Sequence, residues 1–367
     1  MLRRNFIALT LFLLGFPEIP AAENSEKARD FFTGFQFHRQ HIWAHHKEMR
    51  PYTSRPANSL EFTLGLQTHG NKLWESLYNF PAYGVGFFYS DLGREEVLGN
   101  VKSGFLFLEF PIRRGDRFDT RMKYSLGLSY FSNFYDEFEN PANQFIGTPW
   151  NVHFNLNYSW LFHLSHQWQV APGLSFTHFS NGAYRKPNKG FNLFDVNLGV
   201  RYHLNGLPAL PSERPSVESP SGLPQRKLFM VFSFGTMQRN VGDPNYSART
   251  FSVNLTRQSG LKNRWGIGMD LFYDEHAKEQ VRNENNNAHP VKYLRGGSYV
   301  SHDLIFNRMS LVMNLGVYVF YGYEPVQPIY QRVGLRYAID RRLLTSLTLK
   351  AHYGQAEYVE WGIGYGF

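Results

Sequence analysis

Apolar and polar residues alternate at every second position along most of the chain. This period is typical of β-strands whose two faces meet different surroundings. In residues 118–132 the apolar members of the pattern share one parity: Phe118, Met122, Tyr124, Leu126, Leu128 and Tyr130. The polar members share the other parity: Asp119, Arg121, Lys123, Ser125 and Ser129. The same alternation recurs over residues 151–162, 263–274 and 344–354, so an all-β protein is predicted.

The alternation predicts about sixteen strands that close into one barrel. They are expected at residues 33–45, 59–67, 82–90, 101–112, 118–132, 151–162, 168–181, 191–204, 227–239, 247–258, 263–275, 297–306, 309–321, 329–339, 344–354 and 357–367. The first two have the weakest pattern, and without that pair the number is fourteen. An even number of strands puts both termini on the periplasmic side of an outer-membrane barrel.

Composition favours a membrane barrel over a soluble β-sandwich. The chain holds 33 Phe, 22 Tyr and 32 Gly, and aromatic residues make up 17% of it. After residue 22 there is no apolar run of about 18 residues that would form a membrane helix. A transmembrane antiparallel β-barrel accounts for both observations, because aromatic girdles and an apolar outer face surround a polar interior.

The last strand has the sharpest pattern. Its apolar residues occupy every second position up to the final residue: Val359, Trp361, Ile363, Tyr365 and Phe367. A final strand of this kind resembles the signal by which the barrel-assembly machinery recognises bacterial outer-membrane proteins. That machinery is therefore an expected partner during biogenesis.

The first 22 residues are interpreted as a secretory signal peptide. Arg3 and Arg4 precede an apolar run over residues 6–16, and Ala21 or Ala22 is the expected cleavage position. The chain has no Cys, which excludes a lipid anchor, thiol catalysis, thiolate metal sites and disulfides. Residues 23–367 are expected to form a single outer-membrane barrel domain.

The predicted loops fit this orientation with one exception. Residues 307–308 and 340–342 give short periplasmic turns, and residues 133–150 and 276–296 give long external loops. The exception is residues 206–226, a Pro- and Ser-rich segment on the periplasmic side that is interpreted as a flexible linker. We find no sequence repeat and predict no second domain.

Charge and cofactor signals point to lipid. The formal net charge is +8, and for an outer-membrane barrel the expected anion is a phosphorylated lipid and no nucleic acid. No nucleotide-binding signature is present, and no cofactor is expected. Four histidines cluster near the N-terminus, namely His38, His41, His45 and His46. On a helix two of them would share a face and bind metal, but on the predicted strand they are ordinary neighbours, and no metal is expected.

One strand carries reactive groups on its apolar face. Leu174, Phe176, His178 and Ser180 share one parity, so the imidazole and the hydroxyl are expected to face the lipid. Polar groups there are costly unless they are used or paired. Residues two apart on a strand lie roughly 6.5–7 Å apart at Cα. His178 and Ser180 are therefore within reach of a hydrogen bond between a nucleophile and a base.

The next strand offers a third residue for the site formed by His178 and Ser180. Asn192 has the outward parity and is expected beside His178 across the hairpin, where its side chain would orient the imidazole. Asp195 is the nearest carboxylate on that strand, but it has the inward parity. The pattern therefore favours Asn192 over Asp195 as the residue that orients the imidazole.

The motif His178-Phe179-Ser180-Asn181, followed by Pro187-Asn188-Lys189-Gly190, resembles the PagL-type lipid A 3-O-deacylases, and the chain length resembles a larger acyloxyacyl-hydrolase branch. The resemblance implies an outer-membrane barrel in which Ser180 is the nucleophile and His178 the general base. It also implies oxyanion donors at Asn181 and Gly182. The family has a Glu where this sequence has Asn192. Three loop cations are candidates for binding lipid phosphates: Arg185, Lys186 and Lys189.

The expected function is therefore an outer-membrane esterase that removes an ester-linked acyl chain from lipid A, or lipopolysaccharide. The first alternative is a pore or transport barrel without enzymatic activity, since sixteen strands would enclose a water-filled lumen. The second is an assembly barrel whose linker at 206–226 tethers a partner. The sequence leaves open whether a homodimer forms.

Overall fold

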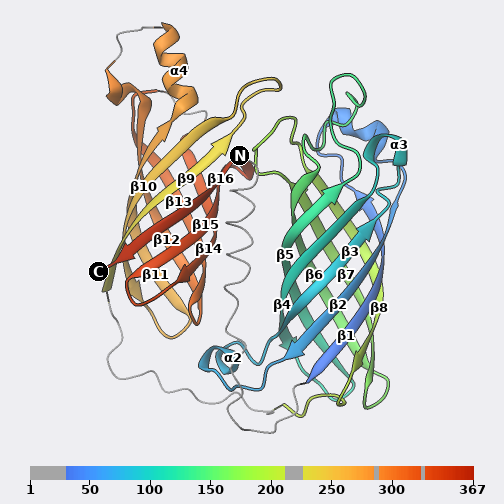
Figure 1. Ribbon diagram of the computed structural model, residues 1–367. Helices are drawn as coiled ribbons and strands as arrows, with labels where there is room; N and C mark the ends of the chain where they lie inside the picture. Colours follow the sequence, from blue (N-terminus) through green and yellow to red (C-terminus); the bar gives the residue numbers. More distant parts are fainter. Residues whose placement is uncertain (1–29, 211–225, 285–288, 324–326) are drawn as a thin grey trace. The chain divides into compact units, whose positions relative to one another are not determined.

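The strands close into two separate antiparallel β-barrels of eight strands each (Figure 1). The computed structural model describes residues 30–210, 226–284, 289–323 and 327–367. Strands β1–β8 make the first barrel and strands β9–β16 make the second.

The first barrel is closed by its first and last strands. Its strands are β1 (Phe31–Ile42), β2 (Ala57–Gln67), β3 (Ala82–Ser90), β4 (Val101–Arg113), β5 (Phe118–Phe131), β6 (Trp150–His163), β7 (Trp168–Ser180) and β8 (Phe191–His203). Closure runs from the pair Phe32↔His203 to the pair Ile42↔Leu193. The connections carry three short helices: η1 (Lys47–Tyr52), α2 (Leu73–Leu77) and α3 (Glu95–Leu98).

The second barrel closes in the same way. Its strands are β9 (Arg226–Met237), β10 (Tyr246–Gln258), β11 (Asn263–Asp274), β12 (Leu294–Phe306), β13 (Met309–Tyr321), β14 (Ile329–Ala338), β15 (Leu343–His352) and β16 (Gln355–Gly366). Pairing of β16 with β9 runs from Glu360↔Gly235 to Gly366↔Phe229. Helices α4 (Glu275–Glu284) and η2 (Pro290–Tyr293) lie between β11 and β12.

The prediction of one barrel spanning residues 23–367 is therefore wrong. The strand segments follow the predicted ones closely, but β8 turns back to pair with β1. The alternation of side chains identifies strands without specifying which of them close a cylinder. The Pro- and Ser-rich segment separates the two barrels in the sequence, and most of it, residues 211–225, lies outside the described residues. The predicted signal peptide, residues 1–22, lies outside them too.

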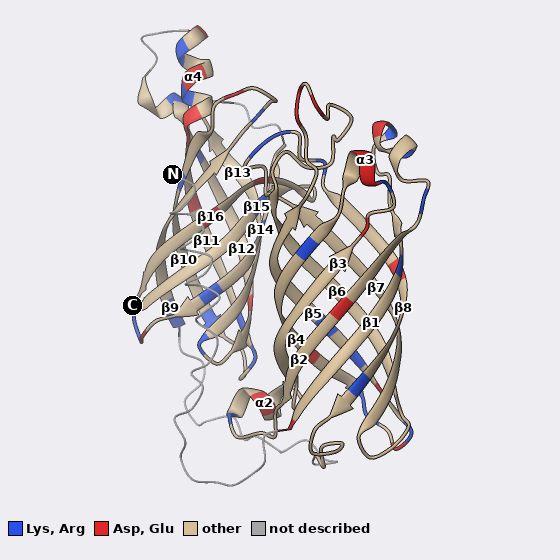
Figure 2. Ribbon diagram, turned by 45° about the vertical axis from the view of Figure 1, so that its right-hand side comes forward, with Lys and Arg blue, Asp and Glu red and all other residues tan. Residues whose placement is uncertain are grey.

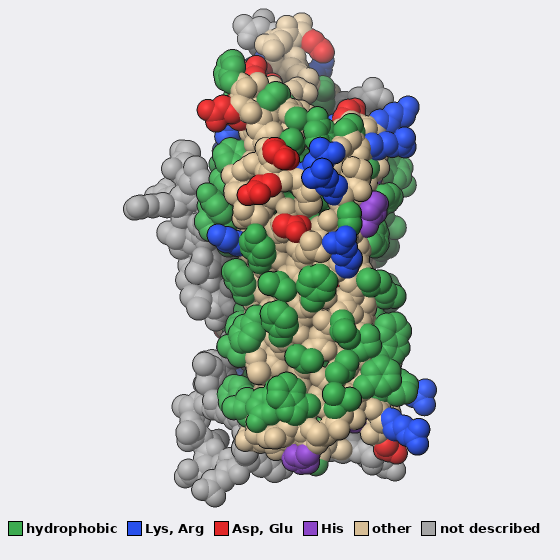
Figure 3. Space-filling model, turned by 90° about the vertical axis from the view of Figure 1, so that its right-hand side faces the viewer, with side chains coloured by type: hydrophobic (Ala, Val, Ile, Leu, Met, Phe, Trp, Pro, Cys, Tyr) green, Lys and Arg blue, Asp and Glu red, His purple; other side chains and the backbone are tan. Residues whose placement is uncertain are grey.

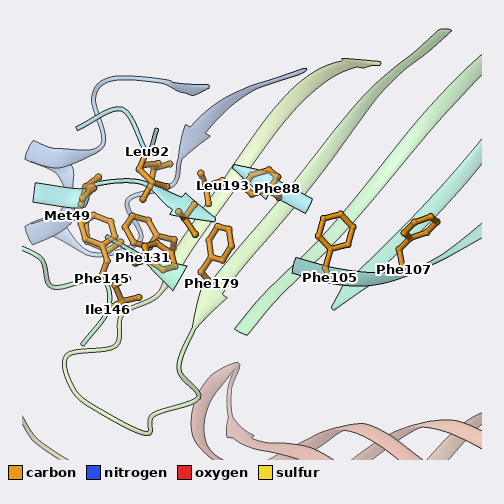
Figure 4. Close-up of a cluster of buried hydrophobic side chains, with 14 of the residues drawn as sticks. Met49, Phe88, Leu92, Phe105, Phe107, Phe131, Phe145, Ile146, Phe179 and Leu193 are labelled. Carbon is orange, nitrogen blue, oxygen red and sulfur yellow. The ribbon is translucent and has the colours of Figure 1, made fainter. Parts of the chain in front are cut away.

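The interior of the first barrel is packed with side chains. At one end, buried apolar residues from several strands and loops pack together, including Phe131, Phe145 and Phe179 (Figure 4). Elsewhere the interior holds ion pairs. In one of them, Glu109 accepts a hydrogen bond from Arg201 at 2.7 Å. The ion pair of Lys123 with Glu61 lies in the same interior.

The second barrel is filled by its own charged network. Arg332 lies between Asp270, at 3.2 Å, and Glu360, at 2.5 Å. The ammonium of Lys350 lies over the ring of Phe272, with 4.3 Å to the centroid. Eight strands enclose a space just wide enough for side chains. The wide lumen on which the pore alternative depended is therefore absent from the two barrels that the structure describes.

On the face of the first barrel shown in Figure 3, the outer surface is mainly apolar, in contrast to the charged interior. Hydrophobic side chains form a broad belt there, and charged side chains gather beyond it (Figure 3). Along the ribbon, Lys, Arg, Asp and Glu lie in the loops and near strand ends and also within strands, where the interior ion pairs are formed (Figure 2). None of the helices in the described ranges has the length and apolar character needed to span a membrane.

Because β1 pairs with β8, the first barrel is expected to fold without the second. A chain truncated after residue 210 should give a compact barrel whose electrophoretic mobility in SDS changes only after heating. Its resistance to protease should match that of the first barrel in the full chain. A truncated chain that folds only when residues 226–367 are added back would contradict this.

Candidate active site

The candidate site lies at the end of β7, where the chain leaves the strand, and at the start of β8. His178 pairs with Asn192 in the β7–β8 ladder. Along β7, Leu174 is 51% exposed, whereas Thr177 and Phe179 are fully buried in the interior. His178 and Ser180 therefore share the outward face of the strand with Leu174, as their parity predicts.

The imidazole of His178 lies between two polar side chains. Its Nδ1 is 2.7 Å from Asn192 Oδ1, and its Nε2 is 3.1 Å from Ser180 Oγ. An amide oxygen can only accept a hydrogen bond, so Nδ1 carries the proton and Nε2 presents its lone pair. The Ser180 hydroxyl then donates to Nε2. The three residues singled out from the sequence thus form one hydrogen-bonded chain.

Asp195 is separated from this chain, as its inward parity predicts. It is buried and accepts from Ser175 Oγ at 2.6 Å and from Gln40 Nε2 at 3.1 Å. Its other oxygen lies 3.0 Å from His38 Nδ1. The carboxylate therefore belongs to the interior network of the barrel and is not available to His178.

Residues 181–190 form the loop beside the pair. The backbone N–H of Asn181 donates to Asn188 Oδ1 at 3.1 Å. The side-chain amide of Asn181 donates to the backbone oxygen of Arg185 at 2.8 Å and to Thr148 Oγ1 at 3.3 Å. Asn181 thus fixes the shape of the loop, and Gly182 follows it with a φ of 64°.

The far end of this loop is fixed against the β5–β6 connection. The N–H of Gly190 donates to the oxygen of Phe145 at 2.8 Å. Gly190 has a φ of 76°, and a Cβ there would lie 3.1 Å from both His178 Cε1 and the oxygen of Phe179. The position therefore requires glycine both for its backbone conformation and for the space beside the imidazole.

Replacing Gly190 by alanine should lower both stability and activity. The left-handed conformation costs an L-residue about 1–2 kcal/mol, and the added methyl group would displace the His178 ring. We expect the midpoint of unfolding to fall and kcat to drop about tenfold, since small misplacements are costly in catalysis. Gly242→Ala is the matched control, because Gly242 has a φ of 88° with open space around it. If both variants retain full activity, the contact with His178 has no catalytic importance.

The three loop cations differ in their surroundings. Arg185 is exposed, whereas Lys189 is half-buried and lies 3.3 Å from Glu48 of helix η1. A hydrogen bond from the backbone N–H of Glu48 and the ion pair with Lys189 hold the pKa of that carboxyl below its usual value. This partner is not predictable from the local sequence pattern, because Glu48 is far from Lys189 along the chain. Lys189 thus connects the loop to the β1–β2 connection as well as carrying charge.

A histidine that the sequence did not assign to the site lies next to Asn192. His45 Nδ1 is 3.3 Å from Asn192 Nδ2, and its Nε2 is 2.8 Å from the oxygen of Lys189. His38 of the same sequence cluster faces the interior instead. Burial and the neighbouring His45 and Lys189 side chains lower the pKa of His46. The cluster is therefore divided between two faces of the barrel.

Apolar side chains surround the pair on the outer face. Val152 is the ladder partner of Ser180, and Phe154 is the partner of His178. Phe176 contacts Phe194 with 5.0 Å between ring centroids, and Phe194 contacts Trp43 at 5.9 Å. These apolar side chains continue along the outer face from the end of β7 that carries His178 and Ser180.

Two family models match adjacent parts of the chain. The model for lipid A 3-O-deacylase (PagL) matches residues 60–201, which contain His178, Ser180 and Asn192. The model for the C-terminal domain of acyloxyacyl hydrolase matches residues 226–367, which contain the second barrel. No curated protein sequence matches the chain.

Solved structures that are similar to the chain include three outer-surface or transport proteins. Neisserial surface protein A is 8% identical, with a TM-score of 0.32, over 47% of this chain and 96% of its own. The Pseudomonas putida toluene transporter TodX is 7% identical, with a TM-score of 0.19, over 93% of this chain and 88% of its own. The FrpB iron transporter from Neisseria meningitidis is 9% identical, with a TM-score of 0.24, over 94% of this chain and 70% of its own.

Proposed function

Because the chain belongs to the lipid A 3-O-deacylase (PagL) family, whose members hydrolyse ester bonds, we propose that it is an outer-membrane esterase that uses Ser180 to remove an acyl chain from lipid A. The observation that carries this proposal is the His178 ring, which is hydrogen-bonded to Ser180 on one side and to Asn192 on the other. A serine beside a neutral, oriented imidazole is the arrangement of an activated nucleophile.

The reaction proceeds by acyl transfer. Ser180 Oγ attacks the ester carbonyl carbon of lipid A while its proton passes to His178 Nε2. The imidazolium then gives this proton to the sugar oxygen as the bond between that oxygen and the acyl carbon breaks, leaving an acyl-serine. Water attacks the acyl-serine with His178 again accepting the proton, and the proton returns to Ser180 Oγ as the fatty acid leaves.

The developing oxyanion requires donors beside Ser180. The backbone N–H of Asn181 already donates to Asn188, and its side chain holds the loop. Of the two residues implied by the family motif, Gly182 is therefore the better source of a backbone N–H for the oxyanion. Asn181 supports it by fixing the loop. Loss of one oxyanion donor typically costs about 10²–10³ in kcat.

Substrate binding follows from the surroundings of the pair. The acyl chain lies along the outward apolar side chains, among them Phe154 and Phe176. The phosphates of lipid A meet Arg185 and Lys186, with Lys189 contributing charge from its ion pair with Glu48. In this orientation the end of β7 lies in the outer leaflet, and both ends of the first barrel's chain lie on the periplasmic side.

Mass spectrometry of lipid A from cells that do or do not express the protein tests the proposal. Expression of the wild-type chain should remove the mass of one hydroxylated or plain fatty acyl group from lipid A. Expression of the Ser180→Ala variant at equal level in the outer membrane should leave lipid A unchanged. Lipid A of unchanged mass with the folded wild-type protein would refute the proposed function.

A further inference from the structure

Asn192 poses an orientation problem that a carboxylate would not have. A carboxylate presents an oxygen to His178 in either orientation, whereas an amide presents an oxygen in one and an NH₂ group in the other. If the NH₂ group faced His178, Nδ1 would have to accept and Nε2 would carry the proton. His178 could then not take the proton of Ser180. The site therefore needs something that fixes the Asn192 amide.

We propose that His45 is a positioning residue that holds the Asn192 amide with its oxygen toward His178. This inference rests on the proposed function of the Ser180–His178 pair. His45 reaches the amide from the β1–β2 connection, which is remote in sequence from β7 and β8. It touches neither Ser180 nor the reacting ester, and it acts through Asn192.

The hydrogen bonds of His45 fix which of its nitrogens accepts. Its Nε2 lies 2.8 Å from the oxygen of Lys189, which can only accept, so Nε2 carries the proton. In the neutral ring Nδ1 is then an acceptor, and it faces Asn192 Nδ2 at 3.3 Å. The oxygen of Trp43 also lies 3.2 Å from Nδ1. A neutral imidazole has one N–H, and the shorter contact, with the oxygen of Lys189, assigns it to Nε2.

The surrounding backbone holds His45 and Asn192 in register. The N–H of Trp43 donates to the backbone oxygen of Asn192 at 2.8 Å, so the β1–β2 connection continues the pairing of β1 with β8. Lys189, whose backbone oxygen accepts from His45, is held in turn by the ion pair of its ammonium group with Glu48. These contacts fix the backbone of Asn192. Among the described residues other than His178, His45 is the one whose contact with the Asn192 side chain distinguishes the amide oxygen from the NH₂ group.

Two substitutions at position 45 separate this role from simple packing. His45→Asn places an amide oxygen near the position of Nδ1, where it can accept from Asn192. His45→Gln places its amide near Nε2, where it can still donate to Lys189 but leaves Asn192 without an acceptor. In the full-length protein in detergent micelles with lipid A, we expect His45→Gln to lower kcat about fivefold to tenfold, the range for loss of one hydrogen bond. KM should stay nearly constant.

His45→Asn should retain most of the kcat that is lost in His45→Gln. In the Asn192→Asp background the His45→Gln substitution should change kcat by less than about twofold, since the carboxylate needs no fixed orientation. Equal losses in His45→Asn and His45→Gln, or an undiminished loss in the Asn192→Asp background, would overturn the proposal.

A measurement independent of turnover keeps the inference distinct from the proposed function. Nitrogen-15 NMR of ring-labelled histidine, with His178 assigned by its loss in His178→Ala, reports which nitrogen carries the proton. The wild type and His45→Asn should show His178 protonated on Nδ1, and His45→Gln should show a population protonated on Nε2. An unchanged Nδ1–H form in His45→Gln overturns the role of His45 whether or not the protein hydrolyses lipid A.

Discussion

Replacing Ser180 by alanine is expected to abolish the release of fatty acid from lipid A. The substitution removes the hydroxyl that lies 3.1 Å from His178 Nε2 and that the proposed mechanism uses as the nucleophile. Loss of the nucleophile in a serine hydrolase lowers kcat by about 10⁶. The variant should fold normally, because Ser180 ends β7 on the outer face and lies outside the packed interior. Purified protein and lipid A in micelles, with fatty acid quantified by mass spectrometry, give the measurement.

The chain provides a matched control for this substitution. His163 and Ser165 have the same His-x-Ser spacing at the β6–β7 turn, but Ser165 Oγ accepts from the backbone N–H groups of Gln167 and Trp168. His163 Nδ1 contacts the oxygen of Asp116 instead of a serine. Ser165→Ala should therefore retain full activity. Activity that persists in Ser180→Ala would assign the nucleophile to another residue.

Replacing Asn192 by aspartate is expected to raise kcat. Asn192 Oδ1 lies 2.7 Å from His178 Nδ1. In the proposed mechanism His178 gains a positive charge during acyl transfer, which a neutral amide cannot offset. Aspartate has the same shape as asparagine and carries a negative charge that would offset the positive charge on His178. The opposite change, Asp to Asn, in a serine protease triad lowers kcat by about 10⁴. We expect a gain of about tenfold to a hundredfold here, because aspartate buried at this position also incurs a desolvation cost.

Initial rates at saturating lipid A for the wild type, Asn192→Asp and Asn192→Leu measure this effect. Leucine has a similar volume and cannot accept the hydrogen bond of Nδ1, so its kcat should fall below that of the wild type. A folded Asn192→Asp protein that is no faster than the wild type would mean that His178 does not become charged in the rate-limiting step.

The alternation of side chains was sufficient to locate the strands and the faces of the candidate residues. Within a strand, parity alone decides the side of the sheet, and a short hairpin brings neighbouring positions together. Ser180, His178 and Asn192 therefore meet as the sequence predicts, and Asp195 is directed into the interior.

The closure of the barrels could not be predicted in this way. Every strand has an apolar outer face whether eight or sixteen of them form the cylinder, so parity carries no information about which strand pairs with β1. The Pro- and Ser-rich segment between the two sets of strands is the available signal, but its composition is equally typical of a flexible periplasmic linker within one barrel. Pairing of β8 with β1 is a long-range contact that local patterns do not encode.

The contribution of the β1–β2 connection was missed for a related reason. His45 lies 147 positions from Asn192 in the sequence, and only the closure of β1 on β8 brings them together. Glu48 reaches Lys189 by the same route. A single barrel of sixteen strands would place β1 beside the last strand, and these contacts would then not form.

Covalent labelling tests the central claim most directly. The full-length protein in micelles is treated with a long-chain alkyl fluorophosphonate, and the modified peptide is identified by mass spectrometry. The account predicts one label, on Ser180, that is lost in His178→Ala and retained in Ser165→Ala. A protein that removes acyl chains from lipid A but is labelled at another residue, or is not labelled at Ser180, would contradict it.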